Sequence, residues 1–193
     1  MTNILKIENP LIKDDVELHV LTKAYLAQLE KLAHDERIWK FATFEHNRFK
    51  EDWIDKALTQ MQENKRLCFV IFYQGKIVGS SSYYYIDLDN KKLTIGYTWI
   101  HPDYWGSKIN RVIKLLMLEY AFETLGCIRV DFQVDSINLP SQNALQKIGI
   151  KQEGLLRNHM LLSNGRIRHT YIYGVTPEEW PDVKKTILTL IKQ

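Results

Sequence analysis

The chain has little of what marks several common classes of protein. It has two cysteines among 193 residues, and no apolar run is long enough to cross a bilayer. Two cysteines cannot supply the disulfide framework of a small secreted domain. Both lie in or beside strand-like apolar runs, Cys68 within Leu67–Tyr73 and Cys127 at the entry to Ile128–Val134, as small buried hydrophobes do. We therefore predict no disulfide, no metal site and no membrane contact.

The sequence also lacks a secretion signal, a linker and a dense basic stripe. Residues 1–9 do not show the charged-then-apolar pattern of a signal peptide, which predicts a cytoplasmic protein. A net charge of +3 is too mild for a nucleic-acid-binding surface, so we expect no nucleic-acid partner. No composition shift divides the chain, so we expect a single domain over residues 1–193, with 177–193 as a C-terminal helical extension.

The spacing of apolar residues predicts strands and helices in a mixed order. The expected strands are Val16–Leu21, Leu67–Tyr73, Lys76–Tyr85, Leu93–Ile100, Ile128–Val134, Glu153–Leu162 and Arg166–Val175. The expected helices are Lys23–His34, Phe49–Asn64, Lys108–Leu125, Leu139–Ile148 and Pro177–Lys192. This order predicts an α+β fold with a mixed, mostly antiparallel seven-stranded sheet and helices on both faces.

The segment Ile95–Ile150 is the most informative about function. A helix of about 17 residues connects the fourth and fifth strands, and such a crossover makes them parallel. The polar turn Asp103–Ser107 precedes that helix, and Asn138 opens the next one. Helix starts carry free backbone N–H groups that bind anions. The pattern therefore suits a ligand with phosphates at one end and a reactive group at the other.

Several motifs occur in this order with regular spacing. They are Ile95-Gly-Tyr-x-Trp-Ile-His-Pro-x-x-Trp-Gly106, Leu118-Glu-Tyr-Ala-Phe-Glu-x-Leu-Gly126, Asn138-x-x-Ser141, Leu145-x-Lys-Ile-Gly149 and Glu153-Gly-x-Leu-Arg157. Together they resemble the GNAT superfamily of acyl-CoA N-acyltransferases. Within it the chain is similar to the branch containing the ribosomal-protein N-terminal acetyltransferases, through Gly165-Arg-x-Arg168 and Trp180. The resemblance implies acetyl-CoA as co-substrate, an amine acceptor, and splayed fourth and fifth strands between which the thioester lies.

The phosphate loop departs from the usual superfamily pattern. Where the superfamily usually has Gln or Arg, this chain has Trp105. At the two positions of the loop that are usually small, it has Lys108 and Asn110. The resemblance is to a sub-branch with a small hydroxyl residue and an Asn, matched by Ser107 and Asn110, whose side chains can donate hydrogen bonds to pyrophosphate oxygens. The alternative is that Ser107 only caps the helix and that Asn110 is a solvated helix residue, with no role of either in phosphate binding. The cofactor-binding residues that we expect are Thr98, Trp99, Ile100, Gly106, Ser107, Lys108, Ile109, Asn110 and Asn138.

Two catalytic positions of the superfamily are also changed. The Tyr that protonates the departing thiolate falls at Leu145, which leaves Ser141 as the hydroxyl near the expected place. The Glu that serves as base falls at Thr94, which cannot accept a proton at neutral pH. His169, His159 and Glu153 are the remaining candidate bases. We expect Ser141 and His169 to be the catalytic residues.

The sequence therefore predicts an acetyl-CoA-dependent N-acetyltransferase that acts by direct attack of a primary amine in a ternary complex. The acceptor is a protein N-terminus or a small amine, and an aromatic slot is expected to hold it. The slot residues are Phe41, Phe44, Tyr83, Tyr84 and Tyr85. A CoA-binding module without catalysis is the second hypothesis, because both usual catalytic side chains are missing. Whether the chain forms a homodimer stays open.

Overall fold

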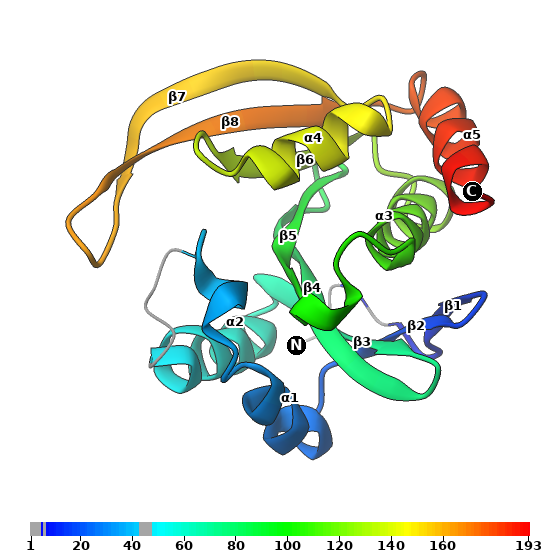
Figure 1. Cartoon of the computed structure of the whole chain (residues 1–193). Helices are drawn as coiled ribbons and strands as arrows, with labels where there is room; N and C mark the ends of the chain where they lie inside the picture. The colour runs from blue at the N-terminus through cyan, green and yellow to red at the C-terminus, as the bar shows by residue number, and fades with distance from the viewer. Residues whose placement is uncertain (1–4, 6, 43–47) are drawn as a thin grey trace.

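The computed structural model describes residue 5 and residues 7–42 and 48–193, and its strands form one mixed sheet (Figure 1). The strands are β1 (Leu11–Lys13), β2 (Val16–Val20), β3 (Arg66–Tyr73), β4 (Lys76–Asp87), β5 (Lys92–Ile100), β6 (Arg129–Asp135), β7 (Lys151–Leu161) and β8 (Ile167–Val175). Their order across the sheet is β1-β2-β3-β4-β5-β6-β8-β7. The helices are α1 (Leu26–Leu32), α2 (Lys56–Gln62), α3 (Ile109–Glu119), α4 (Leu139–Lys147) and α5 (Trp180–Ile191).

The α+β fold and its mixed sheet are confirmed, and the strand count differs by one. The described chain contains eight strands instead of the expected seven. The additional strand, β1, has three residues directly after Pro10 and pairs antiparallel with β2. Three residues are too few to show a period of two in the sequence, so periodicity could not detect this strand.

Two expected helices are interrupted by wider turns. The segment expected as Phe49–Asn64 begins with a π-helical turn at Lys50–Asp55, before α2. The helix expected as Lys108–Leu125 changes from α3 to a π-helical turn at Tyr120–Thr124. Apolar spacing alone cannot distinguish these turns from a regular helix, because both keep the same buried face toward the sheet.

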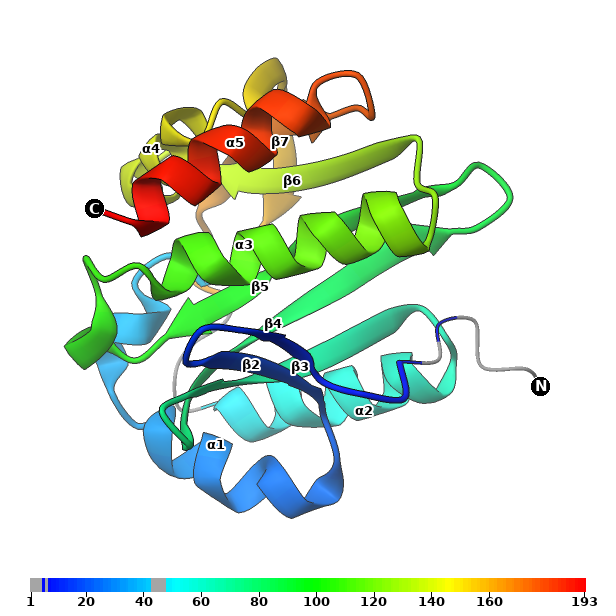
Figure 2. The same cartoon turned by 90° about the vertical axis from the view of Figure 1, so that its right-hand side faces the viewer.

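The sheet separates two hydrophobic cores. Side chains alternate between the faces, so on β3 Phe69 and Ile71 belong to one core while Cys68 and Val70 belong to the other. The first core is closed by α3 and α5, which lie side by side on one face (Figure 2). The second core is closed by α1 and α2 and is rich in tryptophan. Helices thus cover both faces, as the sequence predicts. No helix among the described residues is long and apolar enough to span a membrane.

The parallel pair β5 and β6 is joined over only a short length. Their register runs from Lys92 opposite Arg129 to Thr94 opposite Asp131, and no pairing follows beyond that point. On its other edge, β5 stays paired with β4 as far as Ile100 opposite Gly79. Six residues of β5 therefore have no strand partner on the side that faces β6, and the two strands diverge from Ile95 onward.

Tyr83→Phe should lower the free energy of unfolding by about 1 kcal/mol, the usual net worth of a buried hydrogen bond. Tyr83 is fully buried on β4, and its hydroxyl donates to the backbone carbonyl oxygen of Met117 on α3 at 2.6 Å. Urea denaturation measures the change. Tyr85→Phe is the matched control, because the Tyr85 side chain is 65% exposed. Equal unfolding midpoints for the two variants would show that the Tyr83 hydroxyl adds nothing to the contact between α3 and the sheet.

Candidate active site

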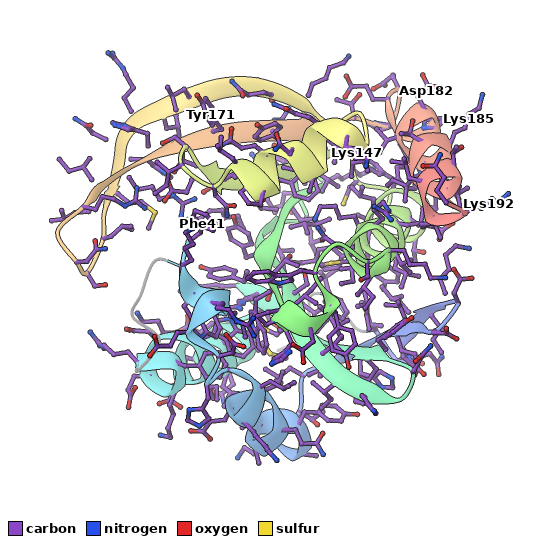
Figure 3. All side chains as sticks on the ribbon, viewed as in Figure 1. Phe41, Lys147, Tyr171, Asp182, Lys185 and Lys192 are labelled. Atoms are coloured by element: carbon purple, nitrogen blue, oxygen red, sulfur yellow. The ribbon has the colours of Figure 1, made fainter. Side chains whose placement is uncertain are left out.

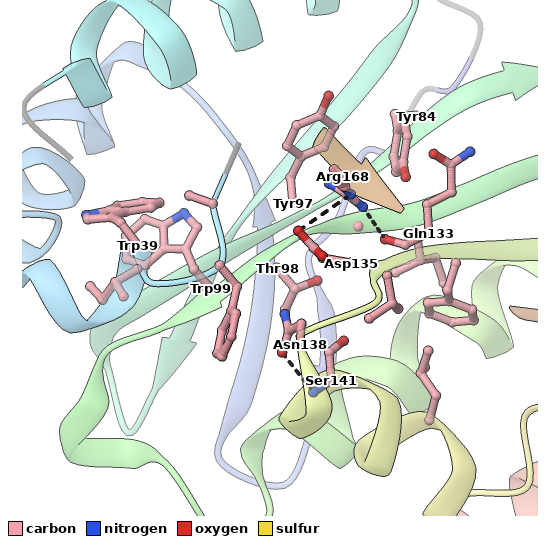
Figure 4. A pocket seen from close by; sticks show the side chains of 18 of the residues that line it. Trp39, Tyr84, Tyr97, Thr98, Trp99, Gln133, Asp135, Asn138, Ser141 and Arg168 are labelled. Carbon is pink, nitrogen blue, oxygen red and sulfur yellow. Dashed lines mark hydrogen bonds and ion pairs between the residues drawn. The ribbon is translucent and has the colours of Figure 1, made fainter. Parts of the chain in front are cut away.

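A cavity of about 290 Å³ occupies the gap between the diverging strands β5 and β6 (Figure 4). Ile95, Thr98 and Trp99 line it from β5, and Phe132 and Val134 line it from β6. Ile95 and Phe132 directly follow the last paired residues of their strands. The cavity therefore begins where the strand pairing ends.

The start of α4 forms one wall of this cavity. Asn138 caps the helix, since its Oδ1 accepts a hydrogen bond from the backbone N–H of Ser141 at 3.1 Å. Asn138 and Ser141 both line the cavity, opposite Thr98 and Trp99 (Figure 4). In the described part of the chain the Ser141 hydroxyl has no hydrogen-bond partner, so it is free to bind a ligand in the cavity.

The expected β5 contacts differ in what they offer a ligand. Thr98 Oγ1 lies 2.7 Å from the Ser81 hydroxyl, which fixes its orientation. The Trp99 ring is buried against the rings of Trp39, Phe49 and Trp53, so this residue offers a ligand mainly its backbone. The carbonyl oxygen of Ile100 already accepts a hydrogen bond from Trp105 Nε1 at 2.8 Å. Of these groups, the backbone beside Trp99 is the best placed to meet a ligand in the gap.

The loop before α3 lies outside the cavity lining. Gly106 adopts a positive φ of 77°, which favours glycine. Ser107 Oγ donates to the carbonyl oxygen of Tyr104 at 2.6 Å and accepts from the N–H of Ile109 at 3.3 Å. Lys108 Nζ lies 3.8 Å from Asp14 Oδ2. The Ser107 hydroxyl thus has a capping role whether or not it also meets a phosphate.

Ile109 and Asn110, the first two residues of α3, are the remaining expected cofactor contacts, and they contribute in different ways. The Ile109 side chain is fully buried in the core, so only its backbone can take part in binding. The Asn110 side chain points along α3, and its Oδ1 accepts a hydrogen bond from Lys114 Nζ at 2.9 Å. Asn110 keeps its amide N–H groups as donors, which is the role that the sequence predicts for it.

Lys114 is a cavity residue that the sequence analysis did not identify. It lies one helical turn after Asn110, its side chain is 8% exposed, and its Nζ is 6.0 Å from the centre of the Phe132 ring. Burial lowers the pKa of Lys114 to about 8. A lysine inside the otherwise apolar run Val112–Leu118 of α3 is the signal that could have drawn attention to it.

The opposite end of the cavity holds a charge network of Asp135 on β6, Arg168 on β8 and Arg166 directly before β8. Asp135 is 3% exposed and forms a two-point ion pair with Arg166, whose Nη1 lies 3.3 Å from Asp135 Oδ1. Arg168 Nε is 3.9 Å from Asp135 Oδ2 and 3.0 Å from the Thr170 hydroxyl. Arg168 Nη2 donates to the carbonyl oxygen of Gln133 (Figure 4). The carboxylate is therefore already neutralised by two arginines.

Aromatic side chains surround the same end of the cavity, and the sequence predicts some of them. Phe41, Tyr84 and Tyr85 line the cavity, and Phe41 stands between the α1–α2 segment and the β7–β8 hairpin (Figure 3). Tyr83 does not line it, because this ring points into the first core. Phe44 falls outside the described residues. Further walls come from Trp39, Trp53 and Tyr97, which sequence reasoning did not assign to the slot.

The three candidate bases do not line the cavity. Strand residues alternate, so with Arg168 facing the cavity, His169 faces away, and its Nδ1 accepts from the backbone N–H of Asn158 at 2.9 Å. His159 is exposed, with its Nδ1 3.0 Å from the Thr170 hydroxyl. Glu153 is ion-paired with Arg129. His169 thus supports the irregular stretch of β7, where Asn158 has a φ of 50°, and this placement does not favour a catalytic role.

The described residues bring no three His, Cys, Asp or Glu side chains together as a metal site. The polar groups that line the cavity instead include the Thr98 and Ser141 hydroxyls, the Asn138 side-chain amide, the Lys114 ammonium and the ion pair of Arg168 with Asp135. This set suits a ligand that carries carbonyl groups and a sulfur atom.

The sequence profile of the acetyltransferase (GNAT) domain matches residues 15–151, which is more than half of the chain. The protein therefore belongs to the GNAT acetyltransferase family. Among solved structures, a "putative acetyltransferase" from T. thermophilus is 28% identical, with a TM-score of 0.85 over 97% of this chain and 100% of that chain. A GCN5-related N-acetyltransferase from Brucella melitensis, 24% identical with a TM-score of 0.85 over 96% of this chain and 86% of that chain, shares the fold.

Curated relatives match over a smaller share of the chain. The "Putative ribosomal N-acetyltransferase YdaF" of Bacillus subtilis (strain 168) is 30% identical over 59% of this chain and 61% of its own length. The "Uncharacterized N-acetyltransferase p20" of Bacillus licheniformis is 24% identical over 60% of this chain and 64% of its own. The matched region of this chain thus spans less than two thirds of these relatives.

Asp135→Asn should make the free energy of unfolding less dependent on pH in the acid range. Burial raises the pKa of Asp135, but the hydrogen bond from Arg166 and the charges of Arg166 and Arg168 outweigh it and leave this pKa below its usual value. Such a carboxylate stabilises the fold above its unfolded pKa of about 3.9 and loses that contribution as the pH falls toward the folded pKa.

The free energies of unfolding of the wild type and Asp135→Asn should therefore differ at pH 7 and converge as the pH falls below about 4. Chemical denaturation at a series of pH values measures this. Asp89→Asn, in the exposed turn between β4 and β5, is the control and should run parallel to the wild type. A constant gap between wild type and Asp135→Asn down to the lowest pH would contradict a lowered pKa.

Proposed function

We propose that the protein is an acetyl-CoA-dependent N-acetyltransferase that transfers the acetyl group directly to the α-amine of a peptide or protein N-terminus. The observation that carries the proposal is the early divergence of β5 from β6, which leaves strand backbone groups unpaired beside the start of α3. Buried backbone N–H and C=O groups need partners, and the amides and the thioester of a pantetheine arm can supply them.

In this proposal the cofactor lies in the gap with its pyrophosphate beside Gly106–Asn110. The backbone amides there, with the Asn110 side chain, bind the phosphate oxygens. The backbone near Trp99 and the Asn138 amide hold the pantetheine arm from its two sides. The Ser141 hydroxyl, which faces the cavity without a partner, hydrogen-bonds the thioester sulfur. The protein thus contributes positioning and electrostatic stabilisation, and no covalent intermediate is needed.

The charge of the cavity favours an uncharged or acidic acceptor over a polyamine. Among its described lining residues the ionised side chains are Lys114, Arg168 and Asp135, and the one carboxylate is already paired with arginines. A molecule with several ammonium groups would find no free carboxylate there and would meet two buried cations. A peptide N-terminus carries one amine, and its following residues can lie along the aromatic wall at Tyr84 and Tyr97.

The lack of a nearby base also favours an α-amine. No histidine and no free carboxylate occurs among the described lining residues. An α-amine has a pKa of about 7.8, so about one third of it is unprotonated at pH 7.5, against about 0.1% of a lysine side chain. An α-amine can therefore attack after losing its proton to solvent, whereas an ε-amine needs a base beside it. The name of the Bacillus subtilis relative is consistent with this choice.

Several wider expectations remain proposals. They are one domain over residues 1–193, a cytoplasmic location, and the open question of a homodimer. A CoA-binding module without catalysis is the alternative function, motivated by Thr94 and Leu145 at the usual positions of the base and the acid.

An acceptor panel assayed by release of free thiol from acetyl-CoA tests the proposal. We expect turnover with peptides that have a free N-terminus, none with the same peptides blocked at the N-terminus, and at most weak turnover with spermidine. Peptides with acidic second and third residues should have a lower KM than peptides with lysine there. Faster turnover with spermidine would overturn the acceptor class. Calorimetric binding of CoA without turnover of any amine would favour the binding module.

Ser141→Ala should reduce kcat more than it weakens acetyl-CoA binding. A hydrogen bond to the sulfur gains strength as negative charge develops there, so its loss affects the transition state more than the ground state. Steady-state kinetics and calorimetry with the same protein separate the two effects. Ser136→Ala, at the end of β6 but outside the cavity lining, is the control. Equal losses in kcat and affinity would make Ser141 a binding residue only.

A further inference from the structure

A buried lysine projects from α3 toward the gap between β5 and β6. Lys114 lies in the middle of α3, four residues after Asn110, so both side chains are on the same face of the helix. More than nine tenths of the Lys114 side chain is buried, and what is left exposed contributes to the cavity lining. Its Nζ lies 6.0 Å from the Phe132 ring, and Phe132 is the first β6 residue after strand pairing ends. The ammonium group therefore lies at the narrow end of the gap.

The hydrogen-bonding capacity of this ammonium is mostly unused. An ammonium has three N–H donors. Among the described residues Lys114 Nζ donates one hydrogen bond, to Asn110 Oδ1, and no carboxylate oxygen lies within ion-pair distance. Leaving a buried cation without an anionic partner is costly. Its free donors point to an anion or a strong acceptor that arrives with a ligand.

The same cavity lacks the usual acid of the reaction. Leu145 stands where the superfamily has its tyrosine, and Leu145, Ser141 and Lys114 all line this cavity. A serine hydroxyl can hydrogen-bond a sulfur atom but is a poor proton donor at neutral pH. In the thioester reaction the group that becomes anionic at the end is the sulfur. The Lys114 ammonium, at the narrow end of the gap, can both attract that charge and supply a proton.

We propose that Lys114 is a catalytic residue of the transfer, whose ammonium faces the thioester sulfur and protonates the departing thiolate of CoA. This inference rests on the proposed function. The amine nitrogen forms a bond to the carbonyl carbon, the carbon–sulfur bond breaks, and its electron pair goes to sulfur. The sulfur takes a proton from Lys114 Nζ. The acceptor nitrogen loses its proton to solvent, and neutral Lys114 regains one from water in the cavity.

The acid strength of Lys114 suits this step. Burial lowers its pKa to about 8, close to the pKa of about 8.5 of a thiol, so the proton moves between groups of similar strength. The other titratable groups that line the cavity are Tyr84, Tyr85, Tyr97, Asp135 and Arg168. Burial raises the pKa of Tyr84, and Asp135 stays ionised and paired, so neither competes as the acid near pH 8.

The direct test measures the thiol of bound CoA and needs no turnover. The thiolate is followed by its ultraviolet absorbance during a pH titration of the complexes with wild type and Lys114→Met, with complexes of CoA lacking its sulfur as blanks. A nearby cation lowers the pKa of an acid by about 1 to 3. We expect the bound thiol to have a pKa lower by about this amount in wild type than in Lys114→Met. Equal values in the two complexes would overturn the proposal.

Two further variants separate acid catalysis from a charge effect and from phosphate binding. Lys114→Met should lower kcat on the order of 100-fold, with little change in the KM for acetyl-CoA. Lys114→Arg keeps the charge but not a transferable proton, so it should keep a lowered thiol pKa without regaining kcat. Lys108→Met, within the proposed phosphate loop Gly106–Asn110, should weaken binding of CoA and of CoA lacking its sulfur equally.

The outcomes also separate this inference from the proposed function. If Lys114→Met weakened binding of CoA and of CoA lacking its sulfur to the same extent, with no change in the thiol pKa, Lys114 would be a phosphate ligand and the inference would fail. Thermal unfolding of each variant shows whether it is folded. A protein that is folded but does not bind CoA would instead contradict the proposed function itself.

Discussion

The structure depends on a parallel strand pair that stops after three positions. In most sheets the ladder continues to the strand ends and satisfies every backbone group. Here β5 remains bound to β4, and β6 remains bound to β8, so neither strand can turn back to the other beyond Thr94 and Asp131. Buried N–H and C=O groups require hydrogen-bond partners. A ligand with amide groups can supply these partners to the unpaired backbone groups in the gap. The cavity follows from this divergence, and the start of α4 and the charged side chains of Lys114, Asp135 and Arg168 line it.

The helices around the gap are fixed by the two cores and not by the gap itself. α3 is anchored by Ile109 and Met117 in the first core and by the hydrogen bond from Tyr83 to its backbone. The same helix can therefore expose an amide-rich start at one end and hold Lys114 beneath the cavity without losing its position. Rigid elements place functional groups more accurately than loops do. This separation of anchoring and functional faces explains how α3 tolerates a buried charge.

The fold could be predicted from the sequence because its signals are local and repeated. The continuous apolar run Leu67–Tyr73 and the apolar stripe of α3 each specify an element, and the crossover length specifies a parallel pair. The positions of Thr98, Trp99, Asn138 and Ser141 in the cavity lining could be anticipated, because these residues lie near a strand end or a helix start in the chain. The charge network could not, because Asp135, Arg166 and Arg168 meet only through the pairing of β6 with β8. His169 shows the converse difficulty, because a one-residue difference in strand position decides whether a side chain faces the cavity.

The distribution of charge distinguishes the two halves of the reaction. In the proposed reaction the donor half needs positive potential, because CoA carries phosphates and its sulfur becomes anionic, and Lys114 and the start of α3 would provide it. The acceptor half must accommodate an amine that loses a proton, and a cation placed there would hinder an approaching ammonium. The pairing of Asp135 with Arg166 and Arg168 removes a carboxylate that would have attracted one. In the proposed function such a cavity would favour an acceptor that arrives already neutral, which connects the absence of a base among the described lining residues to the proposed preference for an α-amine.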